Sequence, residues 1–170
     1  MRRALLTLLD RTPLAAITGA MIAEQARIGY ATFFRHYADV HALLVDTVAT
    51  ITDELAEAMM PALLSADSGG AATALITAIA ARRPMFTALL SGAGDALRAE
   101  LARAVIARIS ALPDLLPPEL PRSLALRISV TATIDLLDWW LREEPERDPA
   151  EVAALFDRLV IARLGGKAVR

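Results

Sequence analysis

Residues 17–44, ITGAMIAEQARIGYATFFRHYADVHALL, predict two short helices joined by a tight turn and a third helix that begins at Asp39. Thr18 is the natural cap of the first helix, because its hydroxyl can accept a hydrogen bond from a first-turn N–H. Gly29 suits the capping position of the second helix. The helical spacing of apolar residues breaks only at the turn. It is carried by Ile22, Ala23, Ala26, Ile28, Phe33, Tyr37 and Leu43.

Helical spacing continues on both sides of this stretch. Leucines predict a first helix that ends before Pro13, and the helix from Asp39 should run to about Ser65, with Pro61 kinking it or ending it early. A loop is predicted over residues 65–70. Further helices are predicted over residues 75–83, 84–90, 95–112, 122–143 and 148–164, with a proline-rich connection over residues 113–121. No segment has the alternating pattern of a strand, so the predicted fold class is all-α.

The composition limits the chemistry and the location of the protein. Apolar residues make up 55% of the chain and the net charge is −2, so affinity for nucleic acid would have to come from local charge and geometry. The lack of cysteine excludes disulfides and thiol chemistry. Arg2 and Arg3 precede leucines as in a signal peptide, but Asp10 ends that run too early. No uncharged apolar run approaches ~18 residues, so we expect a cytoplasmic protein without a membrane span.

No pattern of residues points to an enzyme. The sequence has no Ser/His/Asp arrangement in a suitable context, no glycine-rich phosphate loop between a strand and a helix, and no HExxH spacing. His36, Asp39 and His41 surround a turn and a helix cap, which does not favour a metal site. We therefore expect a protein without catalytic activity, cofactor or metal.

Two helices joined by a short turn and packed on a preceding helix form the DNA-binding helix-turn-helix arrangement. Residues 4–44 resemble the N-terminal domain of the tetracycline-repressor-like (TetR/AcrR) family of bacterial transcriptional regulators. The resemblance is carried by Ile17-Thr18, Ile22-Ala23, Ala26, Ile28, the ATFFRHY run at residues 31–37, and Asp39 with Leu43-Leu44.

The resemblance implies a DNA-binding domain over residues 1–44 and an effector-binding and dimerisation domain over residues 45–170. A homodimer of this kind would place two recognition helices in successive major grooves of palindromic double-stranded DNA. A small-molecule effector would control a regulator of this kind, which is most often a repressor. The protein would work in the bacterial cytoplasm, associated with the nucleoid when bound to DNA.

The same resemblance implies which residues meet the DNA. Residues 30–32 would begin the recognition helix and face the major groove, and His36 would touch the phosphate backbone. Each assignment has a plain alternative. Residues 30–32 could form an ordinary exposed helix start, His36 could be a core histidine, and Arg35 could be a solvated side chain. The predicted DNA-binding residues are Thr18, Gly29, Tyr30, Ala31, Thr32, Phe34, Arg35 and His36.

Several positions depart from the family pattern and predict weak or shallowly salt-dependent DNA binding. Ala20 stands where relatives carry a polar residue, and Val40 replaces the lysine that follows the third-helix cap of residues 17–44. Arg27 stands at the turn glycine, and Phe34 lacks the usual hydroxyl. Each lost phosphate contact removes ~0.9 from the logarithmic salt slope. Together with the short first helix, Ala20 and Val40 favour the alternative function, a dimeric ligand-binding or interaction protein with weakened DNA binding.

Two further sites are expected in the rest of the chain. Flexible thioethers suit adaptable apolar pockets. We therefore expect a pocket for a largely apolar effector, lined by Met59, Leu63, Met85 and Phe86. The alternative for each of these residues is an ordinary place in the hydrophobic core. The helix over residues 122–143 is apolar around most of its circumference, so we expect it to pack on two partners. One would be a second subunit, forming a four-helix bundle with the last helices. The predicted dimer residues are Leu126, Val130, Leu137, Trp140, Val152, Phe156, Leu159 and Val160.

Overall fold

The computed structural model describes residues 1–91, 95–111 and 120–162. These ranges form helices and connecting turns without any strand, so the all-α prediction is confirmed. The helices are α1 (Arg2–Leu9), α2 (Gly19–Gln25), α3 (Tyr30–His36), α4 (Val40–Leu64), α5 (Ser68–Ala80), α6 (Arg83–Ser91), α7 (Asp95–Ser110), α8 (Arg122–Arg142) and α9 (Pro149–Phe156). A 3₁₀ turn covers Leu14–Ala16, and a π-helical turn over Asp157–Ile161 continues α9.

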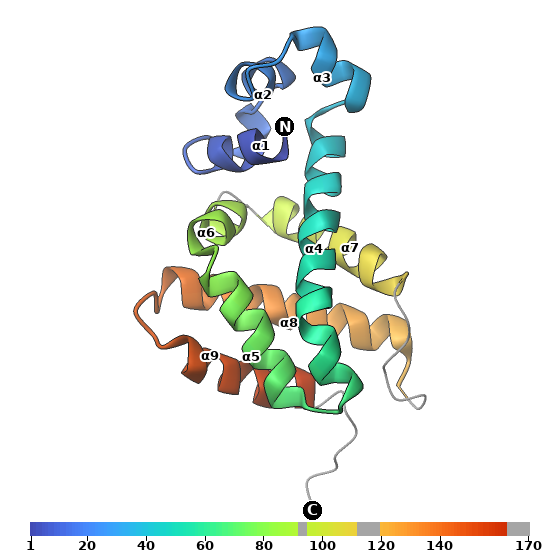
Figure 1. The fold of residues 1–170 in the computed structure, drawn as a ribbon, viewed down its shortest axis with the longest axis vertical. Coiled ribbons are helices and arrows are strands. Elements are labelled where there is room, and N and C mark those ends of the chain that lie inside the picture. Colours follow the sequence, from blue (N-terminus) through green and yellow to red (C-terminus); the bar gives the residue numbers. More distant parts are fainter. Residues whose placement is uncertain (92–94, 112–119, 163–170) are drawn as a thin grey trace, which may run out of the picture.

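The long helix α4 connects two groups of helices (Figure 1). Helices α1–α3 gather around its N-terminal end, and α5–α9 pack around and below its C-terminal half. The Asp39 carboxylate caps α4 by accepting a 2.7 Å hydrogen bond from the Ala42 N–H, as the sequence predicts. The predicted domain boundary after Leu44 falls inside this continuous helix, so the division at that residue stays a prediction.

Local signals place most helix ends correctly, with two corrections. Pro61 lies inside the last turn of α4, so the alternative of an early end is wrong, and the helix runs to Leu64 with Ser65 at its C-cap, close to the predicted end. The predicted loop over residues 65–70 is too long, because α5 begins at Ser68 with the Asp67 carboxylate accepting a 2.8 Å hydrogen bond from the Gly70 N–H. The connection predicted over residues 113–121 and the helix end predicted at Gly165 lie largely outside the described residues.

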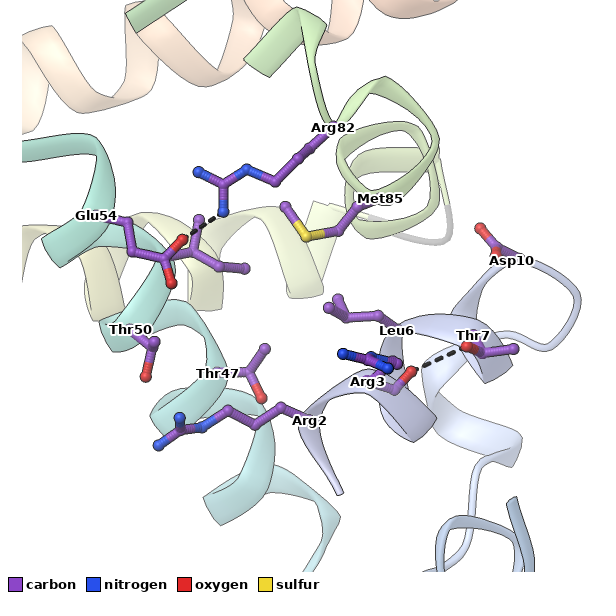
Figure 2. Close-up of a pocket in the computed structure, with 11 residues that line it drawn as sticks. Arg2, Arg3, Leu6, Thr7, Asp10, Thr47, Thr50, Glu54, Arg82 and Met85 are labelled. Carbon is purple, nitrogen blue, oxygen red and sulfur yellow. Dashed lines mark hydrogen bonds and ion pairs between the residues drawn. The ribbon is translucent and has the colours of Figure 1, made fainter. Parts of the chain in front are cut away.

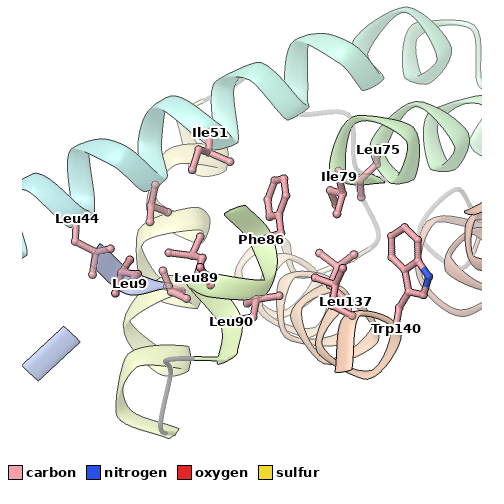
Figure 3. Packing of buried hydrophobic residues seen from close by; sticks show 14 of the residues in the cluster. Leu9, Leu44, Ile51, Leu75, Ile79, Phe86, Leu89, Leu90, Leu137 and Trp140 are labelled. Atoms are coloured by element: carbon pink, nitrogen blue, oxygen red, sulfur yellow. The ribbon is translucent and has the colours of Figure 1, made fainter. Parts of the chain in front are cut away.

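One apolar core runs through both groups of helices. Figure 3 shows Phe86, Leu89 and Leu90 of α6 between side chains of α1, α4 and α8. Helix α5 packs on both α4 and α9, and its Ile76 and Ile79 have almost no exposed surface. Because α1 packs on α6 as well as on α2 and α4, the N-terminal group is held directly against the larger body.

Candidate nucleic-acid interface

Helices α2 and α3 approach each other closely at Gly19. A Cβ atom on this glycine would lie 2.9 Å from Cε1 of Phe33, closer than real Cβ contacts, and 3.1 Å from Cζ of Phe34, which is also a tight contact. Phe33 is fully buried beneath this contact. Thr18 caps α2 by accepting a 3.3 Å hydrogen bond from the Met21 N–H, as predicted. The small residue at position 19 therefore brings the start of α2 beside α3.

In the turn between α2 and α3, Arg27 has the left-handed backbone conformation that glycine usually adopts just after a helix. Arg27 has a φ of 55°, in the left-handed region that glycine tolerates best. The Arg27 N–H donates to the Glu24 carbonyl at 3.0 Å, and the Ile28 N–H donates to the Ala23 carbonyl at 2.9 Å. These two bonds are the Schellman pattern that closes a helix. The tight turn predicted from the broken apolar spacing is confirmed.

The predicted DNA-binding residues occupy the outer surface of α3 and the adjoining start of α2. Tyr30 is 60% exposed and Phe34 is 44% exposed, and their ring centroids lie 4.8 Å apart. His36 is exposed at the end of α3, which excludes the core-histidine alternative. Thr18, Gly29, Ala31 and Arg35 are also exposed, and Thr32 is half-buried. The structure thus brings all eight residues to one end of the molecule, away from α8 and α9 (Figure 1).

Few charged side chains lie on this surface of α3. Arg35 and Arg27 are exposed cations near α3, whereas Ala20 is exposed without a polar group. Val40 is half-buried and packs against the core, so the position that the family pattern gives to a lysine serves packing here. The surface can supply aromatic and hydrogen-bonding contacts, but only a small number of phosphate contacts.

A hydrogen-bonded group of side chains holds α1 against α4. Nε and Nη2 of Arg2 donate to the two carboxylate oxygens of Asp46 at 2.7 and 3.0 Å. The Arg2 guanidinium, together with the Tyr37 hydroxyl, lowers the pKa of Asp46 below its ordinary value. Burial raises the pKa of Tyr37, and its hydrogen bond to Asp46 adds to this. Asp46 is therefore held as a carboxylate, and Arg2 is not free to contact DNA in this arrangement.

A cavity of about 520 Å³ lies between α1, α4 and the start of α6 (Figure 2). Its walls include Arg2, Arg3 and Leu6 from α1, together with residues of α4 and α6. Arg82, just before α6, forms an ion pair with Glu54 of α4 across the cavity wall. No local pattern of residues predicts this cavity, because Arg2 and Arg82, at its two sides, are eighty residues apart in the chain.

The four predicted effector residues do not line one cavity. Met85 lines the cavity beside α1, whereas Phe86 is buried in the core. Met59 and Leu63 lie in the last two turns of α4 and pack against the core. A site formed by these four side chains together is therefore not supported by their positions.

The predicted dimer residues are mostly interior to the single chain. Trp140 and Val152 have no exposed surface, so the prediction that they contact a second subunit is wrong. Leu126, Val130, Leu137, Phe156 and Val160 are also buried, and only Leu159, at 55% exposure, is available. The physical reason is that α8 packs on α6, α7, α9 and the π-helical turn of its own chain. Trp140 lies in the core and its Nε1 donates to the Arg147 carbonyl at 3.2 Å, whereas Trp139 is half-buried.

A different apolar strip on α8 is exposed. Leu124 and Ile128 are four residues apart on one face of the helix, with exposures of 42% and 59%. Leu159 lies on the π-helical turn, which packs on α8. Of the residues predicted for the dimer, only Leu159 belongs to this strip, and the others are buried. Sequence periodicity did not identify it because both faces of α8 are apolar.

Within residues 1–91, 95–111 and 120–162, no group of three or more histidine, cysteine, aspartate or glutamate side chains is arranged to hold a metal ion.

None of the helices in the described ranges combines the length and the apolar character needed to cross a membrane.

No protein-family model matches the sequence, and no curated protein matches it either. Solved structures do match along almost the whole chain. The fatty acid degradation regulator FadR from Bacillus halodurans is 14% identical with a TM-score of 0.67, and the match covers 99% of this chain and 95% of that one. FadR from Bacillus subtilis, solved with stearoyl-CoA, is 12% identical with a TM-score of 0.67, covering 95% of this chain and 96% of that one.

A third match is Thermus thermophilus FadR, a TetR-family transcriptional repressor solved with lauroyl-CoA. It is 18% identical with a TM-score of 0.59, and the match covers 99% of this chain and 94% of that one. The helices thus define an all-α protein with an N-terminal helix-turn-helix unit on a helical body. This is the fold of the TetR-family transcriptional regulators.

Proposed function

We propose that the protein is a DNA-binding transcriptional regulator, a repressor controlled by a small effector. The observation that carries this proposal is the exposed surface of α3. Two aromatic side chains, Tyr30 and Phe34, stand in solvent at the end of the molecule, on a helix that Phe33 anchors to α2. Phe34 also packs on Phe33 and beside Gly19, but the exposed parts of the two neighbouring rings remain available and suit contact with base edges and thymine methyl groups.

The proposed regulator acts as a homodimer on a palindromic operator, because one helix-turn-helix unit reads only a half-site. We assign the dimer face to the exposed strip of Leu124, Ile128 and Leu159, in place of the residues that the core takes up. Covering three large apolar side chains favours association, since apolar area gives roughly 25 cal/mol per Å² removed from water. Helices α8 and α9 lie in the part of the molecule away from α3 (Figure 1), so a dimer face on α8 and the turn that continues α9 leaves both recognition helices accessible.

The comparisons favour an effector with an acyl chain. Two of the matched FadR structures contain lauroyl-CoA or stearoyl-CoA, both of which combine a long apolar chain with anionic groups. The proposal for this chain is the same general class of ligand, an apolar chain with a polar or charged head. Binding of the ligand would favour one orientation of the helix-turn-helix unit and so change the affinity for DNA.

The test is binding of the purified protein to the DNA upstream of its own gene, measured by fluorescence anisotropy across a salt series. A regulator should prefer this DNA over a scrambled duplex of equal length by a factor of about 10³ or more. The sparse cations near α3 predict a shallow slope of log K against log salt, since each phosphate contact contributes about 0.9. A slope near −10 would contradict the geometry described for α3.

Ala20 and Val40 favour a second candidate, a dimeric ligand-binding protein on the same scaffold that has lost useful DNA binding. The same titration separates the two. Equal and weak binding to the upstream and the scrambled duplex, with an intact dimer by light scattering, supports the second candidate and overturns the first.

A further inference from the structure

We infer that the cavity between α1, α4 and α6 binds a small amphipathic anion, such as an alkyl carboxylate. The inference deepens the proposed function, on which its regulatory meaning rests, by naming the site and the charge of the effector. The cavity measures about 520 Å³, within the ~300–1,000 Å³ typical of small-molecule sites. It lies where the helix-turn-helix unit meets the body, and not within the body itself (Figure 2).

The cationic side of the cavity is formed by three arginines. Arg2 and Arg82 use part of their guanidinium groups on Asp46 and Glu54. Arg3 lines the cavity and forms no ion pair with any residue in the described ranges. An arginine without a partner beside a partly enclosed space can donate two parallel hydrogen bonds to a carboxylate. Arg3 is therefore the residue that we assign to the anionic group.

The two acidic residues that line the cavity, Glu54 and Asp10, do not repel an anion bound at Arg3. Glu54 is already paired with Arg82. Asp10 follows Arg3 by seven residues, and Figure 2 shows it at the other end of α1. Seven helical residues span about 10 Å, so the two charges are well separated. An anion held at Arg3 lies far from Asp10.

Beside Thr7, Thr47 and Thr50, three apolar side chains line the cavity and would contact the alkyl portion of the ligand. Leu6 of α1, Ile51 of α4 and Met85 of α6 all line the cavity. In Figure 2 the Met85 side chain extends into the space between Arg82 and Leu6. A thioether adapts to chains of different length, because it has several accessible rotamers. A purely inorganic anion would leave these apolar side chains without contacts.

The position of the cavity explains how its occupant could change DNA binding. One wall is α1, which belongs to the helix-turn-helix unit, and the other walls are α4 and α6 of the body. A ligand that contacts α1, α4 and α6 at once stabilises the arrangement of these three helices in which all its contacts can form. By linkage, DNA bound to α3 and the ligand in this cavity then change each other's affinity by the same factor.

The test is calorimetric titration of the full chain, without DNA, using decanoate, 1-decanol and acetate. We expect decanoate to bind at least about tenfold more tightly than 1-decanol, and acetate to bind too weakly to measure. Arg3→Gln should weaken decanoate binding about tenfold. The matched control is Arg27→Gln, which removes an exposed arginine of the same unit that does not line the cavity and should leave decanoate binding unchanged.

Thr50→Trp gives a second, independent variant, because Thr50 lines the cavity and a large ring there should fill it. Circular dichroism identifies any variant that fails to fold. Lack of decanoate binding, equal binding of decanoate and 1-decanol, or unchanged binding in folded Arg3→Gln and Thr50→Trp would each overturn the inference. DNA affinity with and without decanoate is measured separately. Decanoate binding without DNA binding contradicts the proposed regulator but keeps the site, and the reverse result contradicts the site alone.

Discussion

The hydroxyl of Tyr37 donates a 2.6 Å hydrogen bond to Oδ2 of Asp46. Tyr37 ends α3 and Asp46 lies in the second turn of α4, so the bond fixes the recognition helix to the long connecting helix. The same carboxylate binds Arg2 of α1. One side chain of α4 therefore holds two of the other helices of the N-terminal unit, and a movement of α4 would be passed to both.

Tyr37→Phe should lower the free energy of unfolding by about 1–2 kcal/mol, because it removes a hydrogen bond to a charged acceptor while the ring keeps its packing on Phe33. Urea denaturation measures the change. Tyr30→Phe is the matched control, because Tyr30 is 60% exposed and its hydroxyl has no hydrogen bond within the described residues. Equal unfolding midpoints for the two variants would contradict the role assigned to Tyr37.

Asp46 should make part of the stability depend on pH in acid. Its folded pKa lies below the ordinary value of 3.8, first because of the Arg2 guanidinium and then because of the Tyr37 hydroxyl. A lowered carboxyl pKa contributes stability that is complete above the ordinary value and is lost as the pH falls through the folded value. Asp46→Asn should therefore flatten the plot of unfolding free energy against pH below about pH 5.

Arg2→Gln should give a similar flattening, because it removes the largest cause of the lowered pKa of Asp46. The measurement for both variants is urea denaturation at a series of pH values from about 2 to 7. If both variants keep the acid slope of the wild type, the Arg2–Asp46 pair does not contribute to stability in solution.

Gly19→Ala should destabilise the helix-turn-helix unit by about 1–3 kcal/mol, the usual cost of forcing an extra methyl group into a packed contact. The new Cβ would lie 2.9 Å from the Phe33 ring. Gly29→Ser is the comparison, because its Cβ would meet only Thr32 Oγ1 at 3.6 Å and its hydroxyl could cap α3. That variant should gain a few tenths of a kcal/mol. Thermal unfolding should thus shift in opposite directions for the two substitutions.

Ile128→Glu and Leu159→Glu should convert the proposed dimer into folded monomers, since both side chains are exposed in the single chain. Leu137→Glu should instead lower stability by more than about 3 kcal/mol, because it places a charge in the core. Light scattering and circular dichroism distinguish the two results. A folded Ile128→Glu protein that remains dimeric would place the interface elsewhere.

Tyr30→Ala should weaken binding to the upstream DNA by about 1–3 kcal/mol without changing the unfolding midpoint, because the side chain is exposed. Thr73→Ala is a suitable control on an exposed position of α5, far from α3. The measurement is fluorescence anisotropy at one fixed salt concentration. Unchanged affinity in Tyr30→Ala would remove the aromatic surface of α3 from the DNA interface.

The helix-turn-helix frame follows from local features of the amino-acid sequence. Caps such as Thr18 and Asp39, and the spacing that buries Phe33, depend on residues that are neighbours along the chain. Helix periodicity and capping are local properties, so they can be read before any tertiary contact is known.

The packing of the helices, in contrast, sets which apolar face of α8 is interior and which residues surround the cavity beside α1. A helix that is apolar on most of its circumference carries no signal for which neighbour covers which side, and so Trp140 is core while Ile128 is exposed. Arg3 and Arg82 meet at one cavity because α1 packs on α6. Contacts between residues so far apart in the chain depend on how helices pack, and local sequence does not encode that packing directly.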